Sequence, residues 1–317
     1  MGALEILAES EDFMLLNEAI GGFVIAKLAD GYSKTTIKMY ECRLNVLSDW
    51  LRNPEIENIT TRNLRDFLYY LRTDFKPYRP GGDDSHLTEA TIHGYWKAIR
   101  AFWKWAAEDL DTENVALLIK APRYKLKPIT PLSKSEVILL LHAVESDRKG
   151  RKRSTRLRDR AIILFFLDTG LRLGELLRLQ VKEVDLHTGK VIVRPHQRGR
   201  KTSGRIVYIG NKTRKDLWKY LSFRDTTSDD EPIFDITPGA LKHMLRRLGN
   251  KSGIKCHAHK IRHTFAINFL RNGGNVFELQ RLLGHSSLDM VRHYLNIAES
   301  DIENAHRKAS PVDRWNI

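Results

Sequence analysis

Apolar residues recur three or four positions apart through the first hundred residues, which is the spacing of the buried face of an amphipathic helix. One such series is Tyr40, Leu44, Leu47 and Leu51. The pattern predicts helices over residues 12–28, 33–52, 60–73 and 88–108. Between the last two, the polar stretch 77–85 contains prolines and glycines that cannot continue a helix. The first hundred residues are therefore predicted to be helical throughout.

This periodicity stops between residues 121 and 133, where the sequence APRYKLKPITPLS carries three prolines and three basic residues. Such a composition is typical of an extended linker between domains. We predict a helical domain over residues 1–120, a linker over 121–133, a second domain over 134–298 and a tail over 299–317. The linker is either a solvated tether or a segment that follows a phosphate backbone. The tail is either frayed or a docking arm.

The second domain combines two periodicities. Helical spacing predicts helices over residues 133–145, 159–168, 238–250, 259–272, 275–283 and 287–298. Residues 190–194 and 205–209 alternate apolar and polar positions around a basic turn, so they are predicted to pair as strands. The expected fold class is mainly α: a helical N-terminal domain, and a mostly helical second domain with one small antiparallel sheet.

The chain has 53 lysines and arginines against 39 acidic residues, which gives a formal net charge of +14. This surplus favours a polyanionic partner, and nucleic acid is the first candidate. No apolar run approaches the roughly 20 residues of a membrane-spanning helix, and the N-terminus lacks a signal-peptide pattern. We therefore expect a soluble, cytoplasmic protein with no membrane partner. Cys42 and Cys256 stand far apart and predict buried thiols rather than a disulfide or a zinc site.

Breaking a phosphodiester without a metal ion requires neutralisation of the nonbridging oxygens, a nucleophile in line and an acid for the leaving oxygen. Arg172 in TGLRLGEL and Arg262 in HKIRH are the candidate phosphate clamp, because a guanidinium stays charged and offers forked donors. Glu175 follows Arg172 by one turn and is placed either to hold that guanidinium from behind or to cap the local backbone. The alternative for Arg172 is a surface arginine in a helical ion pair.

His259, Arg262 and His263 share one polar face near the start of a predicted helix, where backbone N–H groups favour anions. On this face His263 is a candidate DNA-binding residue. The alternative is one packed histidine with solvated neighbours. His285 follows a predicted helix end, and Tyr294 lies nine residues later. Tyrosine is ordinarily a packing residue, and a phenol with a pKa of about 10 becomes a nucleophile only beside positive charge or a base.

The turn between the two predicted strands presents four basic residues to solvent or DNA: Arg198, Arg200, Lys201 and Arg205. A basic hairpin is most often a surface that binds the DNA backbone. The residues after Lys201 are small and permit close approach, so this lysine is also a candidate general acid for a leaving 5′ oxygen.

With these residues in order, the chain resembles the tyrosine recombinase family, also called the phage integrases, over its whole length. The resemblance is most specific between residues 169 and 294, where the blocks TGLRLGEL, HKIRHTFA and LLGHSS are followed by a tyrosine. Each block is short. Three of them in order, with a hairpin lysine between the first two, make a strong joint signal.

The resemblance implies a site-specific DNA recombinase or integrase, in which Tyr294 forms a 3′-phosphotyrosyl link that stores the energy of the phosphodiester. No cofactor, ATP or metal ion is then needed. Five basic side chains are implied to surround the scissile phosphate: Arg172, Lys201, His259, Arg262 and His285. The family also implies four protomers on two double-stranded DNA sites. Its N-terminal domain grips the opposite face of the DNA, and its C-terminal segment often docks on a neighbouring protomer.

Two positions depart from the family pattern without touching the chemistry. Lys260 stands where aspartate is common, and His257-Ala258 replaces a commoner threonine-proline. The hairpin varies in length across the family, so Lys190 and Lys212 remain alternatives to Lys201. Two other functions remain open, namely an architectural DNA-binding protein of the same fold and a DNA-relaxing enzyme of the type IB topoisomerase kind. The separate helical domain and the C-terminal arm favour recombination.

Overall fold

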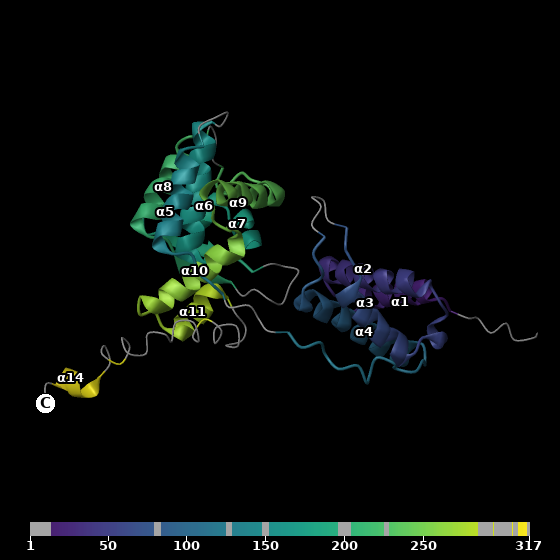
Figure 1. The fold of residues 1–317 in the computed structure, drawn as a ribbon. Helices are drawn as coiled ribbons and strands as arrows, with labels where there is room; N and C mark the ends of the chain where they lie inside the picture. Colours follow the sequence, from purple (N-terminus) through teal and green to yellow (C-terminus); the bar gives the residue numbers. More distant parts are fainter. Residues whose placement is uncertain are drawn as a thin grey trace, which may run out of the picture. The chain divides into compact units, whose positions relative to one another are not determined.

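The structure is a computed structural model, which describes residues 14–78, 84–124, 129–147, 152–195, 204–224, 228–284, 294, 306 and 310–315. The chain divides into two compact units, Met1–Lys127 and Pro128–Ile317, and the division lies inside the segment predicted as a linker. Figure 1 shows the elements of both units along the sequence. The prediction of a mainly helical protein with one small antiparallel sheet is confirmed.

The described residues of the first unit form four helices and one short 3-10 turn, and the four predicted helices are confirmed with small shifts at their ends. They are α1 (Leu16–Ala29), α2 (Lys34–Leu51), α3 (Thr61–Thr73) and α4 (Glu89–Asp109), with η1 (Ile56–Asn58) before α3. A Ser or Thr hydroxyl caps the start of each of the last three helices, as such residues often do. Helix α4 packs against the other three, around a core that includes Phe23, Phe67 and Phe102.

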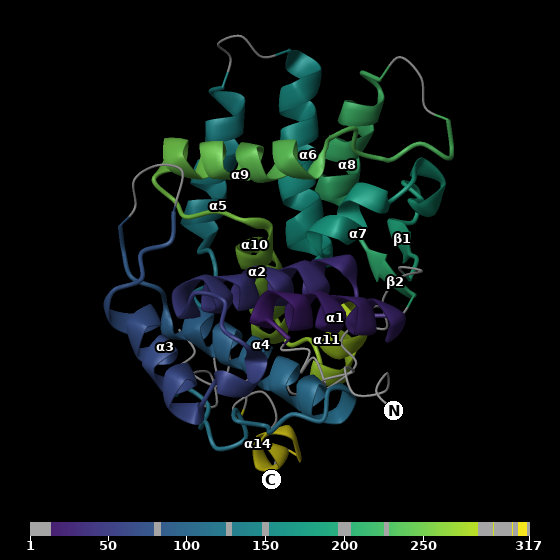
Figure 2. The ribbon, with the colours of Figure 1, turned by 90° about the vertical axis from the view of Figure 1, so that its right-hand side faces the viewer.

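The second unit surrounds one buried helix, α6 (Arg153–Thr169), whose residues Ile162, Phe165 and Phe166 are fully buried. Helices α5 (Lys134–Glu145), α8 (Asn211–Leu221) and α10 (Ala258–Arg271) pack against α6, and α9 (Pro238–Ser252) runs across α5 (Figure 2). The other helices among the described residues are α7 (Leu173–Arg178), η2 (Val181–Glu183), α11 (Val276–Leu283) and α14 (Pro311–Trp315).

The sheet of the second unit consists of β1 (Lys190–Val193) and β2 (Arg205–Tyr208), paired antiparallel. Val191 lies opposite Val207, and both side chains are buried, whereas Ile206 points to solvent. Alternation along β2 therefore turns Arg205 toward the same side as Val207, because successive strand residues point to opposite faces.

Several elements differ from the prediction. Helix α6 begins at Arg153, six residues before the predicted start at 159. The pattern missed this start because the first turns of the helix are polar and carry no apolar period. Helices α7 and α8 were not predicted; α7 is six residues long, and α8 buries only Thr213, Leu217 and Tyr220. The helix predicted over residues 287–298 lies outside the described residues except for Tyr294.

The thiol prediction is half wrong. Cys256 is buried, and burial raises its pKa to about 11, but Cys42 is exposed on α2. Within the described ranges, none of the helices combines the length and apolar composition that a membrane crossing requires. In the same ranges, no group of three or more His, Cys, Asp or Glu side chains is arranged to hold a metal ion.

Candidate active site

The turn before α7 sets the position of Arg172. Gly170 has a φ of +60°, a left-handed conformation that favours glycine, and a Cβ there would lie 2.3 Å from Cδ1 of Phe265. Arg172 is the N-cap residue of α7, and its backbone N–H donates to Oε2 of Glu175 at 2.8 Å. The carboxylate thus satisfies a backbone donor that the first turn of a helix leaves free. Backbone and side chain of Arg172 are held by the same residue.

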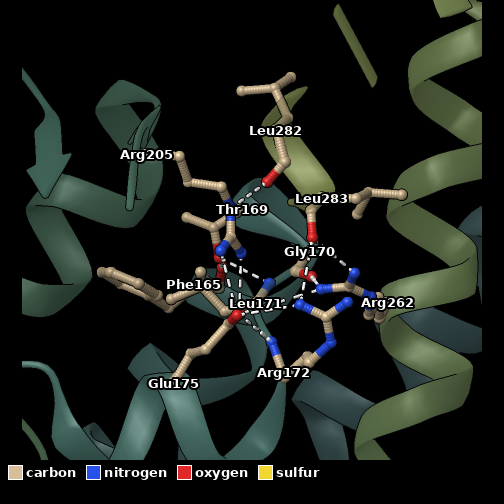
Figure 3. Close-up of polar contacts among 10 residues, drawn as sticks. All are labelled: Phe165, Thr169, Gly170, Leu171, Arg172, Glu175, Arg205, Arg262, Leu282 and Leu283. Carbon is tan, nitrogen blue, oxygen red and sulfur yellow. Dashed lines mark hydrogen bonds and ion pairs between the residues drawn. The ribbon is translucent and has the colours of Figure 1, made fainter. Parts of the chain in front are cut away.

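Glu175 is the acidic centre of the site, with a side chain that is 1% exposed. It accepts hydrogen bonds from Nη1 of Arg172 at 3.1 Å, and from Nη1 and Nη2 of Arg205 at 3.0 and 2.8 Å (Figure 3). Burial alone would raise the pKa of Glu175. The hydrogen bonds and charge of Arg205, together with those of Arg172, outweigh burial and lower the pKa to about 2.

Arg205 corrects one sequence-based expectation. It was expected to present its charge to solvent or DNA, but its side chain is 6% exposed. Besides the two bonds to Glu175, its Nε donates to the carbonyl oxygen of Leu282 at 2.6 Å. The physical reason is the strand: Arg205 begins β2 on the inward side, beside a buried carboxylate that needs a charged partner.

Arg262 lies on α10 and is 1% exposed. Its Nη1 donates to the carbonyl oxygen of Gly170 at 2.6 Å, and its Nη2 donates to that of Leu283 at 2.8 Å. Burial lowers the pKa of Arg262 to about 10, with a further contribution from the charge of Arg172 and opposition from Glu175. The guanidinium remains protonated at neutral pH and adds fixed positive charge to the site.

The C-terminal end of α11 collects these arginines. Leu282 accepts from Arg205, and Leu283 accepts from Arg262 at 2.8 Å and from Nη1 of Arg172 at 3.4 Å. The last carbonyls of a helix lack partners within the helix and carry partial negative charge, so they suit guanidinium donors. Gly284 ends α11 in a left-handed conformation, with φ of +63°. The last turn of α11 is therefore anchored by three arginines.

Two histidines and Tyr294 form the other side of the site. Oη of Tyr294 lies 2.7 Å from Nδ1 of His263, and the ring of His263 meets that of His259 edge-on, with centroids 4.6 Å apart. Tyr294 is 2% exposed and packs with apolar residues of α10 and α11. Burial raises the pKa of Tyr294, while the positive charges of Arg262 and Arg172 act in the opposite direction.

The start of α10 explains the departure at residue 257. His257 is the N-cap residue, and its Nδ1 accepts a hydrogen bond from the backbone N–H of Lys260 at 3.1 Å. Burial, and then the charges of Arg262, His257 and Arg172, lower the pKa of His259. The neutral form of His259 is therefore favoured beside the arginines.

The structure brings together six of the residues proposed from sequence. They are Arg172, Glu175, His259, Arg262, His263 and Tyr294. Four other candidates lie outside the described residues: Arg198, Arg200, Lys201 and His285.

Sequence reasoning missed two features of the site. Arg205 was assigned to the DNA surface, although its position two residues before Val207 signals an inward side chain. His263 was assigned to DNA binding, whereas in the structure it contacts the phenol oxygen of Tyr294. The sequence carries no signal for that second contact, because it joins positions 31 residues apart.

Two family models match the chain. Residues 131–301 match the phage integrase family, and residues 26–109 match the phage integrase N-terminal SAM-like domain. A tyrosine recombinase XerA from Saccharolobus solfataricus is 30% identical over 309 residues, which cover 96% of each chain.

Solved structures share the fold. One is a XerH site-specific recombinase bound to a palindromic difH substrate in a post-cleavage complex, with a TM-score of 0.65 and 20% identity. The match covers 92% of this chain and 94% of that one. Another is a lambda integrase tetramer bound to a Holliday junction, with a TM-score of 0.68 and 17% identity, covering 90% of this chain and 78% of that one.

Proposed function

Because this chain belongs to the phage integrase family of tyrosine recombinases, we propose that it is a site-specific DNA recombinase that cuts and rejoins strands through Tyr294. One observation carries the proposal. Arg172, Arg262 and Tyr294 come from separate parts of the sequence, yet the structure brings them together. Both arginines donate to the carbonyl oxygen of Leu283, and His263, the residue after Arg262, lies 2.7 Å from Oη of Tyr294. A nucleophile beside fixed positive charge is what phosphoryl transfer requires.

The phosphate clamp consists of Arg172 and Arg262. Arg172 keeps 33% of its side chain exposed and reaches the nonbridging oxygens directly, while the buried Arg262 supplies positive charge from behind. Glu175 neutralises one of the three guanidiniums around it, so two positive charges remain for the phosphate. His259, which is favoured in its neutral form, donates a hydrogen bond without adding charge.

In the cleavage step, Oη of Tyr294 bonds to phosphorus and the bond to the 5′ oxygen breaks. Lys201 gives a proton to that oxygen, and His285 donates a hydrogen bond to the phosphate. The new 3′-phosphotyrosyl ester keeps the energy of the broken phosphodiester, so a 5′ hydroxyl from another strand reverses the step without ATP. The roles of Lys201 and His285 rest on the family resemblance alone.

The same proposal extends to the assembly. The first unit grips the DNA face opposite the second unit, the linker over residues 121–133 joins them, and four protomers act on two double-stranded DNA sites. Residues 299–317 dock on a neighbouring protomer. The fold shared with an integrase tetramer on a Holliday junction supports this arrangement. A protein that recombines chromosomal or mobile-element DNA works at the nucleoid in the cytoplasm.

The proposal is tested by trapping the protein on DNA. DNA fragments that crosslink to the protein are sequenced to find its site, and a nicked version of that site is incubated with the protein in EDTA. We expect a covalent adduct with the wild-type chain and none with Tyr294→Phe, because only the attacking oxygen is lost. Tyr220→Phe is the matched control, since Tyr220 is a buried tyrosine of the same unit whose hydroxyl accepts from the backbone N–H of Asp235.

An adduct with the Tyr294→Phe variant would show that another residue is the nucleophile. Absence of any adduct with the wild-type chain, despite tight binding, would favour an architectural DNA-binding protein. A wild-type chain that forms the adduct and relaxes supercoiled DNA, but never exchanges strands between two sites, would favour the topoisomerase alternative.

A further inference from the structure

We propose that His263 is the general base of the cleavage step: its Nδ1 receives the proton of Tyr294 while Oη bonds to phosphorus. This inference rests on the proposed function, because it requires Tyr294 to be the nucleophile. It assigns a chemical role to a histidine that the sequence placed only on a DNA-binding face.

Distance is the first argument. A general base must lie within about 2.6–3.2 Å of the atom whose proton it takes. Nδ1 of His263 lies 2.7 Å from Oη of Tyr294. The phenol O–H donates in this pair when the imidazole carries its own hydrogen on Nε2.

The second argument is that the neighbouring groups are poor proton acceptors. Arg172 and Arg262 are guanidiniums and have no acceptor atom. The oxygens of Glu175 are occupied by Arg172 and Arg205, and its pKa of about 2 makes it a weak base. His259 has a lowered pKa, and within the described residues its ring meets that of His263 edge-on, while the phenol oxygen is hydrogen-bonded to His263.

The third argument is that His263 is held in place. It lies on α10 between Arg262 and Thr264, both buried. Arg262 is fixed by the carbonyl oxygens of Gly170 and Leu283, and the hydroxyl of Thr264 accepts from the backbone N–H of Leu132 at 2.8 Å. A nucleophile in contact with a base whose position is fixed by other groups is the arrangement that activates a hydroxyl.

The proton balance closes within the site. In cleavage, the Oη–H bond breaks, the proton moves to Nδ1 of His263, the Oη–phosphorus bond forms and the 5′ oxygen leaves with a proton from Lys201. In rejoining, the 5′ hydroxyl returns its proton to Lys201 and bonds to phosphorus. The Oη–phosphorus bond then breaks, and the departing phenolate of Tyr294 takes its proton back from His263. Among the described titratable groups, His259 faces this imidazole edge-on, and the charged Arg262 precedes His263 on α10.

The first experiment compares His263→Asn and His263→Ala with the wild-type chain in single-turnover formation of the covalent adduct from pH 6 to 9. Asparagine can still accept the phenol hydrogen bond but cannot take the proton. Both variants should be slower by about 10²–10⁴-fold, the usual contribution of a general base. Their rates should rise about tenfold per pH unit, because only the phenolate then reacts, whereas the wild-type profile should be flatter. If His263 had only a structural role, its variants would be slower but would keep the flatter pH profile of the wild-type chain.

A second substrate separates the base from the acid. A 5′-bridging sulfur in place of the scissile oxygen leaves without protonation, so it should restore cleavage by Lys201→Ala but not by His263→Asn. His142→Asn is the matched control, since His142 is an exposed histidine of α5 in the same unit. DNA affinity and thermal unfolding of His263→Asn should stay close to those of the wild-type chain.

Two outcomes would overturn the inference while leaving the proposed function intact. One is a His263→Asn variant that cleaves at the wild-type rate, which would reduce His263 to a hydrogen-bond partner. The other is a slow His263→Asn variant that the sulfur substrate restores, which would move His263 to the leaving-group side. An adduct formed by Tyr294→Phe is a different result, because it removes the proposed nucleophile itself.

Discussion

The carboxylate of Glu175 accepts hydrogen bonds from both terminal nitrogens of Arg205, at 3.0 and 2.8 Å. Both side chains are buried: Glu175 is 1% exposed and Arg205 is 6% exposed. Since Nε of Arg205 also reaches Leu282, one guanidinium joins β2 to the first turn of α7 and the last turn of α11. Arg172 is the N-cap residue of α7, and α11 precedes Tyr294 in the sequence. The pair is therefore expected to matter for stability and for the geometry of the site.

Replacing Glu175 by glutamine should strongly destabilise the protein. Removing one partner of a buried ion pair leaves uncompensated charge and typically costs about 3–5 kcal/mol. The free energy of unfolding in urea measures this change. Glu145→Gln is the control, because Glu145 is 55% exposed and pairs with Arg160 at the surface, where an ion pair contributes about 0–1 kcal/mol. Equal losses in the two variants would contradict the role given to Glu175.

The same carboxylate should shape the acid stability of the protein. The pKa of Glu175 is lowered in the folded state from an ordinary value of 4.5 to about 2, so its ionised form stabilises the fold above pH 4.5. That contribution, roughly 3 kcal/mol at about 1.4 kcal/mol per pKa unit, should disappear as the pH falls from 4.5 to 2. Unfolding free energies measured across this range should fall more steeply for the wild-type chain than for Glu175→Gln.

Arg205→Ala should lower stability without changing the salt dependence of DNA binding. A phosphate contact would reduce the slope of log affinity against log salt by about one when it is removed. Because Arg205 is buried on Glu175, we expect an unchanged slope and a lower unfolding midpoint. Arg205→Lys should recover only part of the stability, since an ammonium lacks the two-pronged geometry. A reduced slope would restore Arg205 to the DNA surface.

Gly170→Ala should cost more stability than Gly253→Ala. Both glycines have positive φ, +60° and +70°, so both variants carry the strain of a left-handed alanine, about 1–2 kcal/mol. At Gly253 a Cβ meets nothing within 4 Å, but at Gly170 it would lie 2.3 Å from the Phe265 ring. We expect the additional loss, and slower adduct formation, only at Gly170, whose carbonyl accepts from Arg262. Thermal unfolding of the two variants would check the difference.

Arg172→Ala should slow cleavage far more than it weakens binding. The guanidinium acts chiefly where negative charge develops, so its loss falls on the transition state, by about 10²–10³-fold in rate. Adduct formation and the dissociation constant for the same DNA, measured side by side, test this expectation. Comparable losses in both would make Arg172 a general phosphate contact.

Local periodicity made much of the fold predictable. The four helices of the first unit and helices α5, α9, α10 and α11 were predicted because each has a buried apolar face that repeats every three or four residues. The start of α6 and the whole of α8 were missed for the opposite reason. Their residues are mainly polar, and contacts such as that of Arg153 over the ring of Phe223, at 4.9 Å, join distant parts of the chain.

The sequence by itself determined which residue types the site contains. Recognisable blocks of the sequence contain Arg172, Glu175, Arg262 and Tyr294. Covalent structure fixes the chemistry of these side chains, which are two permanent cations, a carboxylate and a phenol.

Only the tertiary structure decided which of these groups touch. It turned Arg205 inward onto Glu175, set Arg172 and Arg262 on the end of α11, and brought His263 to the Tyr294 oxygen. The physical reason is that a buried carboxylate needs a charged partner, and an unpaired helix carbonyl or a buried hydroxyl needs a hydrogen-bond partner. Those partners lie tens of residues away, where no local pattern of the sequence reaches.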